Sequence, residues 1–404
     1  MPEPERTLPL RHNGTGQALM LATLALLALG VVLVHSAVVS TDDLPPWYAR
    51  REIRHTLFAG LALLVMLVGW RLDYRKLLWG QRTPIPALAI LAAAVACGFL
   101  VFTPLGKAVG GYRRWVQFGP EQYAIGFQPS EVIKLALIVF LAAWFGRPGA
   151  DPKSPKTFFV GLLAIGAALT PIMTEDFGTA AVIVAAAGVT MLLAGVPLYY
   201  LFALAGAGAV GFYALVVRVP YRWNRIAAMF DPWSTANATS YQPRQSLTGI
   251  LEGGWTGKGL GEGMQKFFLP ERSTDFIFSV FCEEWGFLGA MLLFGVVGLW
   301  IISARRAAVR SHDPMGRILA GALGFVIASQ ALLHIAVGLV ILPPTGMSFP
   351  FISAGGTALV IMAAAVGLMV SVTAHGPHEA PEPAKQRSPA RADDPPEELA
   401  CPTT

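Results

Sequence analysis

Ten apolar runs, joined by polar connections, limit what this chain can fold into more than any other feature. They cover residues 17–40, 56–70, 85–103, 131–145, 157–173, 178–196, 198–219, 276–302, 318–342 and 355–372. No run shows the period-two alternation of a barrel strand, and an open strand edge is unstable in hydrocarbon, so the runs must be helices. The sequence therefore predicts an all-α polytopic membrane protein with ten transmembrane helices. Several runs are shorter than the ~20 residues that a perpendicular span needs.

Composition supports a membrane protein and excludes several kinds of site. The chain is 54% hydrophobic and 14% charged, and its mean hydropathy is +0.55, which is outside the range of soluble domains. The first run exceeds the roughly 7–15 residues of a signal-peptide core, so we expect it to be retained as a span. Cys97, Cys282 and Cys401 show no paired spacing, and the seven histidines are dispersed. Neither a disulfide framework nor a clustered metal site is indicated.

The distribution of basic residues predicts the orientation. With the N-terminus inside, eleven Lys and Arg residues fall in the inner connections and seven in the short outer ones. The predicted organisation is a cytoplasmic N-terminus (1–16), a ten-helix membrane domain (17–374) and a disordered cytoplasmic tail (375–404) that is rich in Pro, Ala and charge. Within the membrane domain, residues 220–275 form a large extracytoplasmic loop between the seventh and eighth helices.

This long loop is a candidate functional region. Loops of more than about 12–15 residues are usually functional or disordered, and this one contains three tryptophans, which is unlike a disordered segment. Its basic residues include Arg225, Arg244 and Lys258. Basic side chains outside run against the positive-inside tendency, so we expect an anionic partner for them.

The loop ends at Asp275, immediately before the apolar run from Phe276. The Asp275 carboxylate is therefore predicted to lie where water meets lipid. One interpretation is a helix cap, because Asp is a favoured N-cap residue. The other is a catalytic base at the membrane surface, and the two roles are compatible.

Further acids lie beside or inside the apolar runs. Glu131 and Lys134 are three residues apart on one helical face, which favours an ion pair at the head of the fourth span. Glu283 and Glu284 lie within the eighth run, where a structural pair with a basic residue on another helix is expected. Arg113 and Arg114 follow the third span, and each is a candidate interfacial anchor or phosphate contact.

The Gly-rich segment 253–263 does not fit the known nucleotide-binding loops. A Walker loop would need Gly at Glu252 and Ser or Thr at Gly259, and no six-residue window matches the dinucleotide fingerprint. No nucleotide cofactor is therefore expected. The glycines are predicted to let the backbone approach a ligand or a neighbouring helix.

Several of these stretches together resemble one family. They are GGYRRWVQFG, FQPSEVIKLALI, EDFGTA, DPW followed by YQPRQSL, GKGLGEGMQKFFLPERSTDFIFSVFCEEWGFLG and LPPTGMSFPFISAGG. In this order they are similar to the SEDS family (shape, elongation, division and sporulation), which includes RodA and FtsW. The resemblance runs from about Arg113 to Gly356. It departs from the family pattern at Ser273, at residues 174–178 and at Ala354. Asp275 is not among these positions.

The resemblance implies a ten-helix peptidoglycan glycosyltransferase of the bacterial cytoplasmic membrane, with both termini in the cytoplasm. Its substrates would be lipid II and the nascent glycan, for cell elongation or division. Its partner would be a class B penicillin-binding protein, a transpeptidase, and membrane lipids would surround it. No nucleic-acid partner is expected. The resemblance assigns the essential acid to Asp275 and places Glu131 and Lys134 in the site region.

The chemistry that follows is a hypothesis. Asp275 would take the proton from an acceptor sugar hydroxyl, which would contribute ~10²–10⁴-fold. Basic side chains would steady the departing pyrophosphate, with Lys134, Arg113, Arg225, Arg244 and Lys258 as candidates. Alternatively, Asp275 would help to hold a divalent cation, Mg²⁺ or Mn²⁺. The competing functions are a lipid II flippase and a scaffold for the transpeptidase.

Overall fold

The computed structural model describes residues 9–38, 46–78, 83–109, 112–119, 125–173, 175–233 and 240–375. The predicted N-terminal segment 1–16 is described only from residue 9. The predicted tail 375–404 lies outside the described residues except for His375.

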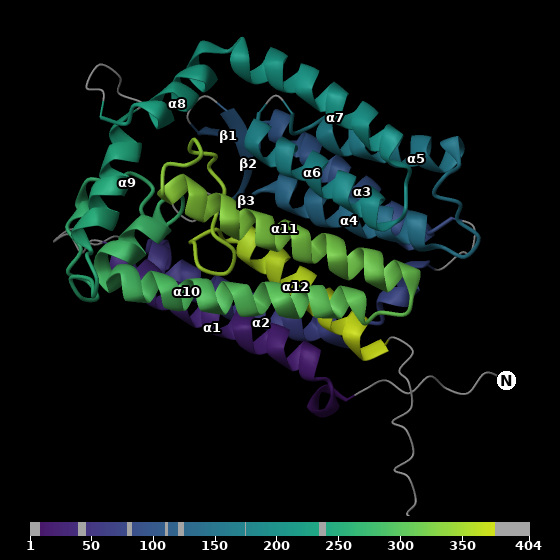
Figure 1. Ribbon diagram of the computed structural model, residues 1–404, viewed down its shortest axis with the longest axis horizontal. Coiled ribbons are helices and arrows are strands. Elements are labelled where there is room, and N and C mark those ends of the chain that lie inside the picture. The colour runs from purple at the N-terminus through teal and green to yellow at the C-terminus, as the bar shows by residue number, and fades with distance from the viewer. Residues whose placement is uncertain are drawn as a thin grey trace, which may run out of the picture.

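Ten apolar helices form the body of the molecule (Figure 1). They are α1 (Gly14–Ala37), α2 (Arg51–Arg71), α3 (Ile85–Gly98), α4 (Pro129–Gly146), α5 (Pro155–Leu169), α6 (Phe177–Leu193), α7 (Leu198–Phe212), α10 (Ile277–Val309), α11 (Pro314–Gly338) and α12 (Thr357–His375). Short 3-10 segments and one π-helical turn accompany them: η1 (Leu10–His12), η2 (Trp47–Ala49), η3 (Tyr74–Leu78), η4 (Phe99–Phe102), η5 (Tyr213–Val217) and η7 (Gln265–Phe267).

The helical class and the multi-pass membrane character are confirmed. Within the described residues, seven helices are long and apolar enough to cross a membrane, counting α3 together with η4. The other three apolar helices are shorter, with 15 residues in α5, 17 in α6 and 15 in α7. All ten coincide with the apolar runs of the sequence, within a few residues at most boundaries.

Local sequence signals explain where several helices start. Proline occupies the first turn of α4, α5 and α11, where its missing N–H removes no helical hydrogen bond. Asp313 caps α11 by accepting a hydrogen bond from the Gly316 N–H. Asp176 caps α6 in the same way by accepting from the Thr179 N–H.

Polar elements gather at one end of the bundle, here named the site end (Figure 1). A three-stranded antiparallel sheet lies there, with β1 (Gly106–Val109), β2 (Tyr112–Phe118) and β3 (Ile125–Phe127) in that order. The register pairs Lys107 with Trp115 and Val116 with Phe127. Two short helices, α8 (Pro220–Phe230) and α9 (Tyr241–Glu252), occupy the predicted loop 220–275. The sequence predicted neither the sheet nor these helices.

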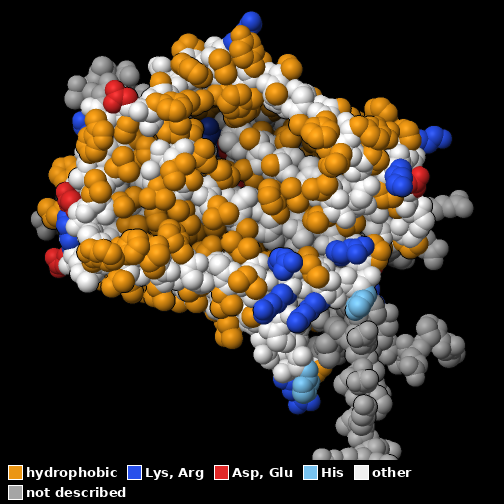
Figure 2. Space-filling model, viewed as in Figure 1, with side chains coloured by type: hydrophobic (Ala, Val, Ile, Leu, Met, Phe, Trp, Pro, Cys, Tyr) orange, Lys and Arg blue, Asp and Glu red, His pale blue; other side chains and the backbone are white. Residues whose placement is uncertain are grey.

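The sides of the helices are covered by hydrophobic side chains, as a lipid-facing surface requires (Figure 2). The helix α7 crosses the top of the view, and none of its side chains is buried. Figure 2 shows that the molecule is hollowed beneath α7, where a basic side chain is visible at depth.

A break in α10 explains why the segment 253–263 is rich in glycine. At Gly286 the backbone leaves the helix, with φ 66° and ψ −165°. Segment 253–263 packs against this break so closely that a Cβ on Gly257 would lie 2.1 Å from the Glu284 carbonyl oxygen. Backbone N–H groups of this segment donate to the carbonyls of Glu283 and Glu284 at 3.0 Å. The prediction that these glycines permit close backbone approach to a helix is confirmed, and the segment supplies bonds that the broken helix lacks.

Candidate functional site

Asp275 lies at the site end, two residues before α10. The N-cap of α10 is Phe276, and no side chain caps this helix end. The interpretation of Asp275 as a helix cap is therefore wrong. The backbone N–H of Asp275 donates to the Glu271 carbonyl at 3.0 Å, and Glu271 itself has a left-handed backbone with φ 53°. Asp275 thus lies on a tight turn with its carboxylate partly buried, and this carboxylate does not cap the start of α10.

The surroundings of Asp275 favour a base that titrates near neutral pH. Burial raises the pKa of the Asp275 carboxyl from 3.8 to about 6, and the negative charge of Glu271 adds to this increase. The positive charges of Arg225 and Arg114 oppose it and lower the pKa. Asp275 is therefore mostly ionised at pH 7 and still basic enough to accept a proton, as a general base requires.

Gly346 leaves a space beside the Asp275 carboxylate. This residue belongs to the connection between α11 and α12 and has φ +73°, which favours glycine. A Cβ placed on it would lie 3.5 Å from Arg114 Nη1 and 3.9 Å from Asp275 Oδ2. The missing side chain of Gly346 therefore leaves room for a small group that would contact both an acid and a guanidinium.

Arg225 reaches this region from α8. The sequence of α8 is amphipathic, and its exposed Trp223 and Phe230 suit a helix at a membrane surface. The Arg225 Nη1 atom donates to the Pro344 carbonyl at 3.1 Å, two residues before Gly346. The structure thus brings Arg225, a predicted site residue, close to Asp275.

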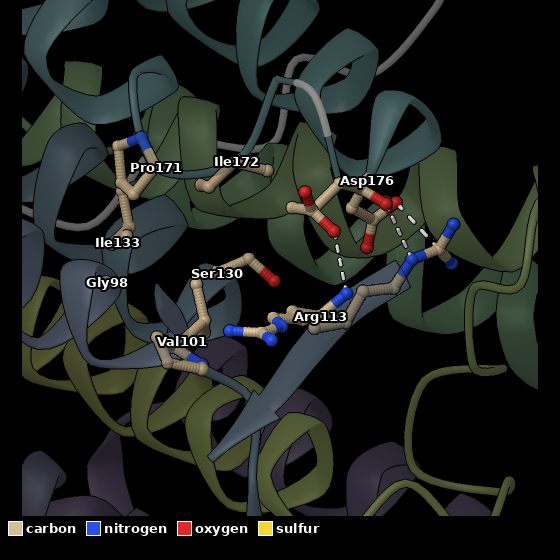
Figure 3. A pocket seen from close by; sticks show the side chains of 11 residues that line it. Gly98, Val101, Arg113, Ser130, Ile133, Pro171, Ile172 and Asp176 are labelled. Atoms are coloured by element: carbon tan, nitrogen blue, oxygen red, sulfur yellow. Dashed lines mark hydrogen bonds and ion pairs between the residues drawn. The ribbon is translucent and has the colours of Figure 1, made fainter. Parts of the chain in front are cut away.

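The strand β2 carries two arginines that line a small pocket (Figure 3). The Arg114 Nε atom donates to the Glu175 carbonyl at 2.8 Å, and its Nη1 lies 4.0 Å from Asp176 Oδ1. The Arg113 N–H donates to the Glu175 carboxylate at 2.6 Å, and its exposed side chain points towards Ser130 in Figure 3. Both arginines therefore line this pocket, and Arg114 also lies next to the Gly346 position beside Asp275.

Glu131 and Lys134 form the predicted ion pair, with 2.8 Å between Oε2 and Nζ. Both side chains are buried in the bundle, and Lys134 also donates to Gln330 Oε1 on α11 at 3.1 Å. This pair joins α4 to α11. Its contacts within the described chain do not reach Asp275.

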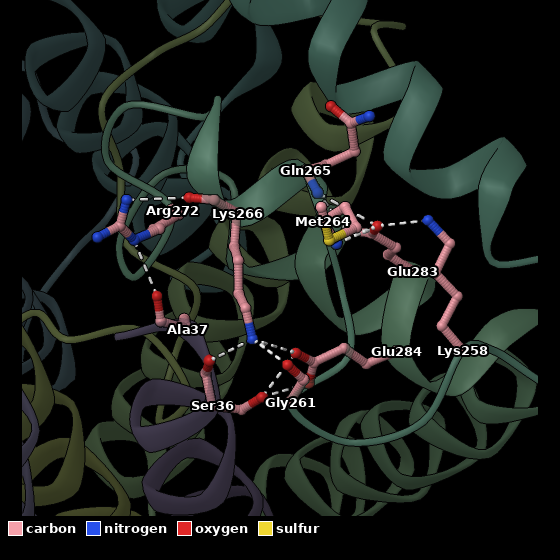
Figure 4. A network of polar contacts seen from close by, with 10 residues as sticks. All are labelled: Ser36, Ala37, Lys258, Gly261, Met264, Gln265, Lys266, Arg272, Glu283 and Glu284. Atoms are coloured by element: carbon pink, nitrogen blue, oxygen red, sulfur yellow. Dashed lines mark hydrogen bonds and ion pairs between the residues drawn. The ribbon is translucent and has the colours of Figure 1, made fainter. Parts of the chain in front are cut away.

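The acids of α10 belong to a separate network (Figure 4). Lys258 Nζ donates to Glu283 Oε1 at 2.8 Å and also pairs with Glu252. Lys266 Nζ lies 3.5 Å from Glu284, and both carboxylates are fully buried. The predicted structural pairing is confirmed, but the lysines come from the segment beside α10 and not from another transmembrane helix.

In this network the Lys258 ammonium group forms ion pairs with Glu252 and Glu283. The sequence predicted this group to bind substrate. Arg244, predicted for the same role, lies on α9, and none of its contacts within the described residues reaches Asp275. The structure thus brings Arg225 to Asp275, holds Lys134 and Lys258 in other ion pairs, and shows no contact between Arg244 and Asp275 within the described residues.

The side chains near Asp275 determine how the predicted divalent cation could be bound there. Within the described residues, no three His, Cys, Asp or Glu side chains converge as metal ligands. Arg225, Arg114 and the Glu271 carboxylate lie close enough to Asp275 to influence its charge. Mg²⁺ is often held by one or two carboxylates together with substrate phosphates. A cation at Asp275 would therefore need oxygen atoms from the substrate.

Comparisons with known proteins show the family of this chain. The model of the FtsW, RodA and SpoVE family, described as "Cell cycle protein", matches residues 17–378. The chain is 36% identical to the "Probable peptidoglycan glycosyltransferase FtsW" of Saccharophagus degradans, over 87% of this chain and 90% of that protein. It is 35% identical to the "Stage V sporulation protein E" of Bacillus subtilis, over 88% of this chain and 96% of that protein.

Solved structures share the fold. A chain from a structure of a peptidoglycan synthase complex that coordinates polymerization and crosslinking matches with a TM-score of 0.69 and 26% identity, over 88% of this chain and 97% of that chain. The Rod shape determining protein RodA of Thermus thermophilus matches with a TM-score of 0.61 and 26% identity, over 88% and 95%. From its motifs, its helices and these relatives, the chain belongs to the FtsW, RodA and SpoVE family of cell cycle proteins, the SEDS family that its sequence resembles.

Proposed function

We propose that this protein is a peptidoglycan glycosyltransferase that polymerises lipid II into glycan strands during cell-wall synthesis, with Asp275 as its general base. Its relatives are named as such enzymes, and one matching chain comes from a peptidoglycan synthase complex. The observation that carries the catalytic assignment is that the position left without a side chain at Gly346 lies next to both the Asp275 carboxylate and the Arg114 guanidinium.

The site end would face the outer leaflet of the cytoplasmic membrane, with both termini in the cytoplasm. Lipid II and the growing glycan are both anchored by isoprenoid pyrophosphates, so their reactive sugars lie just above the lipid. The amphipathic α8, with exposed Trp223 and Phe230, fits that depth. The substrates would therefore meet Asp275 without leaving the membrane.

In the proposed step, a hydroxyl oxygen of the acceptor sugar attacks the anomeric carbon of the donor. Asp275 takes the hydroxyl proton as the new C–O bond forms. The bond between the anomeric carbon and the pyrophosphate oxygen breaks with inversion, and the isoprenoid pyrophosphate leaves as an anion. General-base assistance of this kind contributes ~10²–10⁴-fold.

Arginines near Asp275 would stabilise the departing pyrophosphate. Arg114 and Arg225 are close enough to influence the Asp275 carboxyl, and Arg113 is exposed in the adjoining pocket. One planar guanidinium group can donate two parallel hydrogen bonds to two oxygens of the same phosphate. Lys134, Lys258 and Arg244 stay predictions for this role, and the structure holds the first two in other ion pairs.

A divalent cation, Mg²⁺ or Mn²⁺, stays a prediction. Asp275 would hold it together with substrate phosphate oxygens, and the bound cation would neutralise charge on the pyrophosphate. The two arginines already place positive charge beside Asp275, which favours the role of base over that of ligand.

A class B penicillin-binding protein would crosslink the product. The structural neighbour is part of a synthase complex that coordinates polymerization with crosslinking. The specific transpeptidase would be identified by the penicillin-binding protein that co-purifies with this chain.

The test is purified protein incubated with lipid II in detergent, where no second compartment exists. Glycan chains should grow with the wild type, and a folded Asp275→Asn variant should lose this activity by about 10²-fold or more. A lipid II flippase would make no chains in detergent but would move lipid II across proteoliposomes. A scaffold would do neither, and polymerisation by folded Asp275→Asn at the wild-type rate would refute the assignment of the base.

A further inference from the structure

The connection between α11 and α12 turns back into the bundle below Asp275. We name residues 345–354 of this connection the re-entrant segment. Its residues Phe349, Phe351, Ile352 and Ser353 are each at most 2% exposed. Phe351 has a left-handed backbone with φ 67°, a conformation that costs energy for an aromatic residue. A buried and strained loop of this kind is held by its surroundings and is often part of a functional site.

Two hydrogen bonds join the re-entrant segment to the turn that carries Asp275. The Ser353 hydroxyl donates to the Thr274 carbonyl at 2.7 Å and accepts from the Phe349 N–H at 2.8 Å. The Ala354 N–H donates to the Ser273 carbonyl at 2.9 Å. The two carbonyls that precede Asp275 are therefore both bound by the re-entrant segment.

These bonds fix one particular peptide group. The carbonyl held by Ser353 belongs to the peptide bond that joins Thr274 to Asp275, and the N–H of the same peptide donates to the Glu271 carbonyl at 3.0 Å. With both polar ends bound, the peptide plane cannot rotate without breaking a hydrogen bond. Its orientation sets the direction in which the Asp275 side chain leaves the backbone.

The other end of the re-entrant segment is held as well. The His334 Nδ1 atom lies 3.0 Å from the Met347 carbonyl, and the His334 ring lies against Phe349 with 5.0 Å between the ring centroids. Met347 follows Gly346, which leaves the space between Arg114 and Asp275. One rigid loop thus defines both the orientation of the Asp275 backbone and the opening in front of its carboxylate.

We infer that Ser353 is a positioning residue for Asp275: its hydroxyl aligns the base through the Thr274 carbonyl and touches no substrate itself. This inference rests on the proposed function of Asp275. Ser353 is suited to the task because its single hydroxyl donates to one backbone group and accepts from another, so its own hydrogen is also fixed. Small errors in the placement of a catalytic group are costly, since about 1 Å can lower a rate by about 10²-fold.

The experiment compares Ser353→Ala with the wild type in lipid II polymerisation, normalised to folded protein. We expect kcat to fall by about 10- to 100-fold while KM changes by less than about threefold, because the substrate contacts are untouched. The matched control is Ser371→Ala, which removes a fully buried hydroxyl that donates to the Leu72 carbonyl away from the Asp275 turn. It should keep the wild-type kcat per folded molecule.

A second variant covers the case in which Ser353→Ala does not fold. Ser353→Cys keeps the shape of the side chain but has a larger atom and a weaker donor, so kcat should fall by about 3- to 10-fold. A folded Ser353→Ala or Ser353→Cys protein with the kcat of the wild type would overturn the inference. So would a rate loss equal to that of Ser371→Ala.

The failure of this inference can be told apart from the failure of the proposed function. If the wild type makes no glycan, or if Asp275→Asn remains fully active, the proposed function is wrong. If the wild type is active, Asp275→Asn is inactive and the Ser353 variants keep the wild-type kcat, only the positioning role is wrong.

Discussion

Replacing Asp275 with Asn should stabilise the folded protein while it abolishes activity. The pKa of the Asp275 carboxyl rises from 3.8 to about 6 on folding, mainly because burial disfavours its charged form. Each pKa unit corresponds to about 1.4 kcal/mol, so ionised Asp275 costs about 3 kcal/mol of the free energy of unfolding near neutral pH. Asn has nearly the same shape and carries no charge, so it avoids this cost.

The sign of the effect gives it a defined pH window. Because the folded pKa is the higher one, the neutral carboxyl contributes its full stability below pH 3.8, and this contribution is lost as the pH rises through about 6. The Asp275→Asn protein should therefore match the wild type near pH 4 and exceed it by up to about 3 kcal/mol at pH 8. A catalytic group that costs stability is a common trade-off at active sites.

The assay is denaturant or thermal unfolding in one detergent at pH 4 and pH 8, together with lipid II polymerisation on the same samples. Asp231→Asn is the control, since this exposed carboxylate lies at the end of α8 and should give no pH-dependent gain. An Asp275→Asn protein that is less stable than the wild type at pH 8, or whose advantage does not change with pH, would contradict the reasoning.

Three other expectations follow from the site. Gly346→Ala should lower kcat/KM by more than about tenfold, whereas Gly149→Ala, which has the same φ of +73° but nothing within 4 Å of its added Cβ, should not affect turnover. Lys258→Met should lower the free energy of unfolding by about 3 kcal/mol, because it leaves the buried Glu283 carboxylate without its cation; unchanged stability with a higher KM would instead support a substrate-binding role. A cysteine at Thr274, in a protein without its natural cysteines, should react with a membrane-impermeant thiol reagent from outside intact cells, and labelling only after lysis would reverse the orientation.

Much of the fold was predictable because its signals are local. Ten apolar runs give ten apolar helices, and proline or Asp residues start several of them. The importance of Asp275 also has a local signal, since a lone acid stands at the junction between a polar loop and a long apolar run. The Glu131–Lys134 pair follows from helical spacing alone.

The missed features depend on contacts between distant segments. The sequence could not choose between Arg113 and Arg114, because alternate residues of a strand face opposite sides and the short sheet itself was not foreseen. The bond from Ser353 to Thr274 joins residues 79 positions apart, so no periodicity could reveal it. The partners of Glu283 were also hidden, because they come from a segment that packs against a break in α10.

The pH dependence of lipid II polymerisation tests the central claim most directly. If ionised Asp275 is the base, kcat should rise with pH, reach half its maximum at about pH 6 and level off above about pH 7. Glu271→Gln removes a negative charge that raises the pKa of Asp275, so the midpoint should move to lower pH. A rate that is constant from about pH 5 to 8 in the wild type, or a midpoint that Glu271→Gln leaves in place or moves upward, would contradict Asp275 as the base.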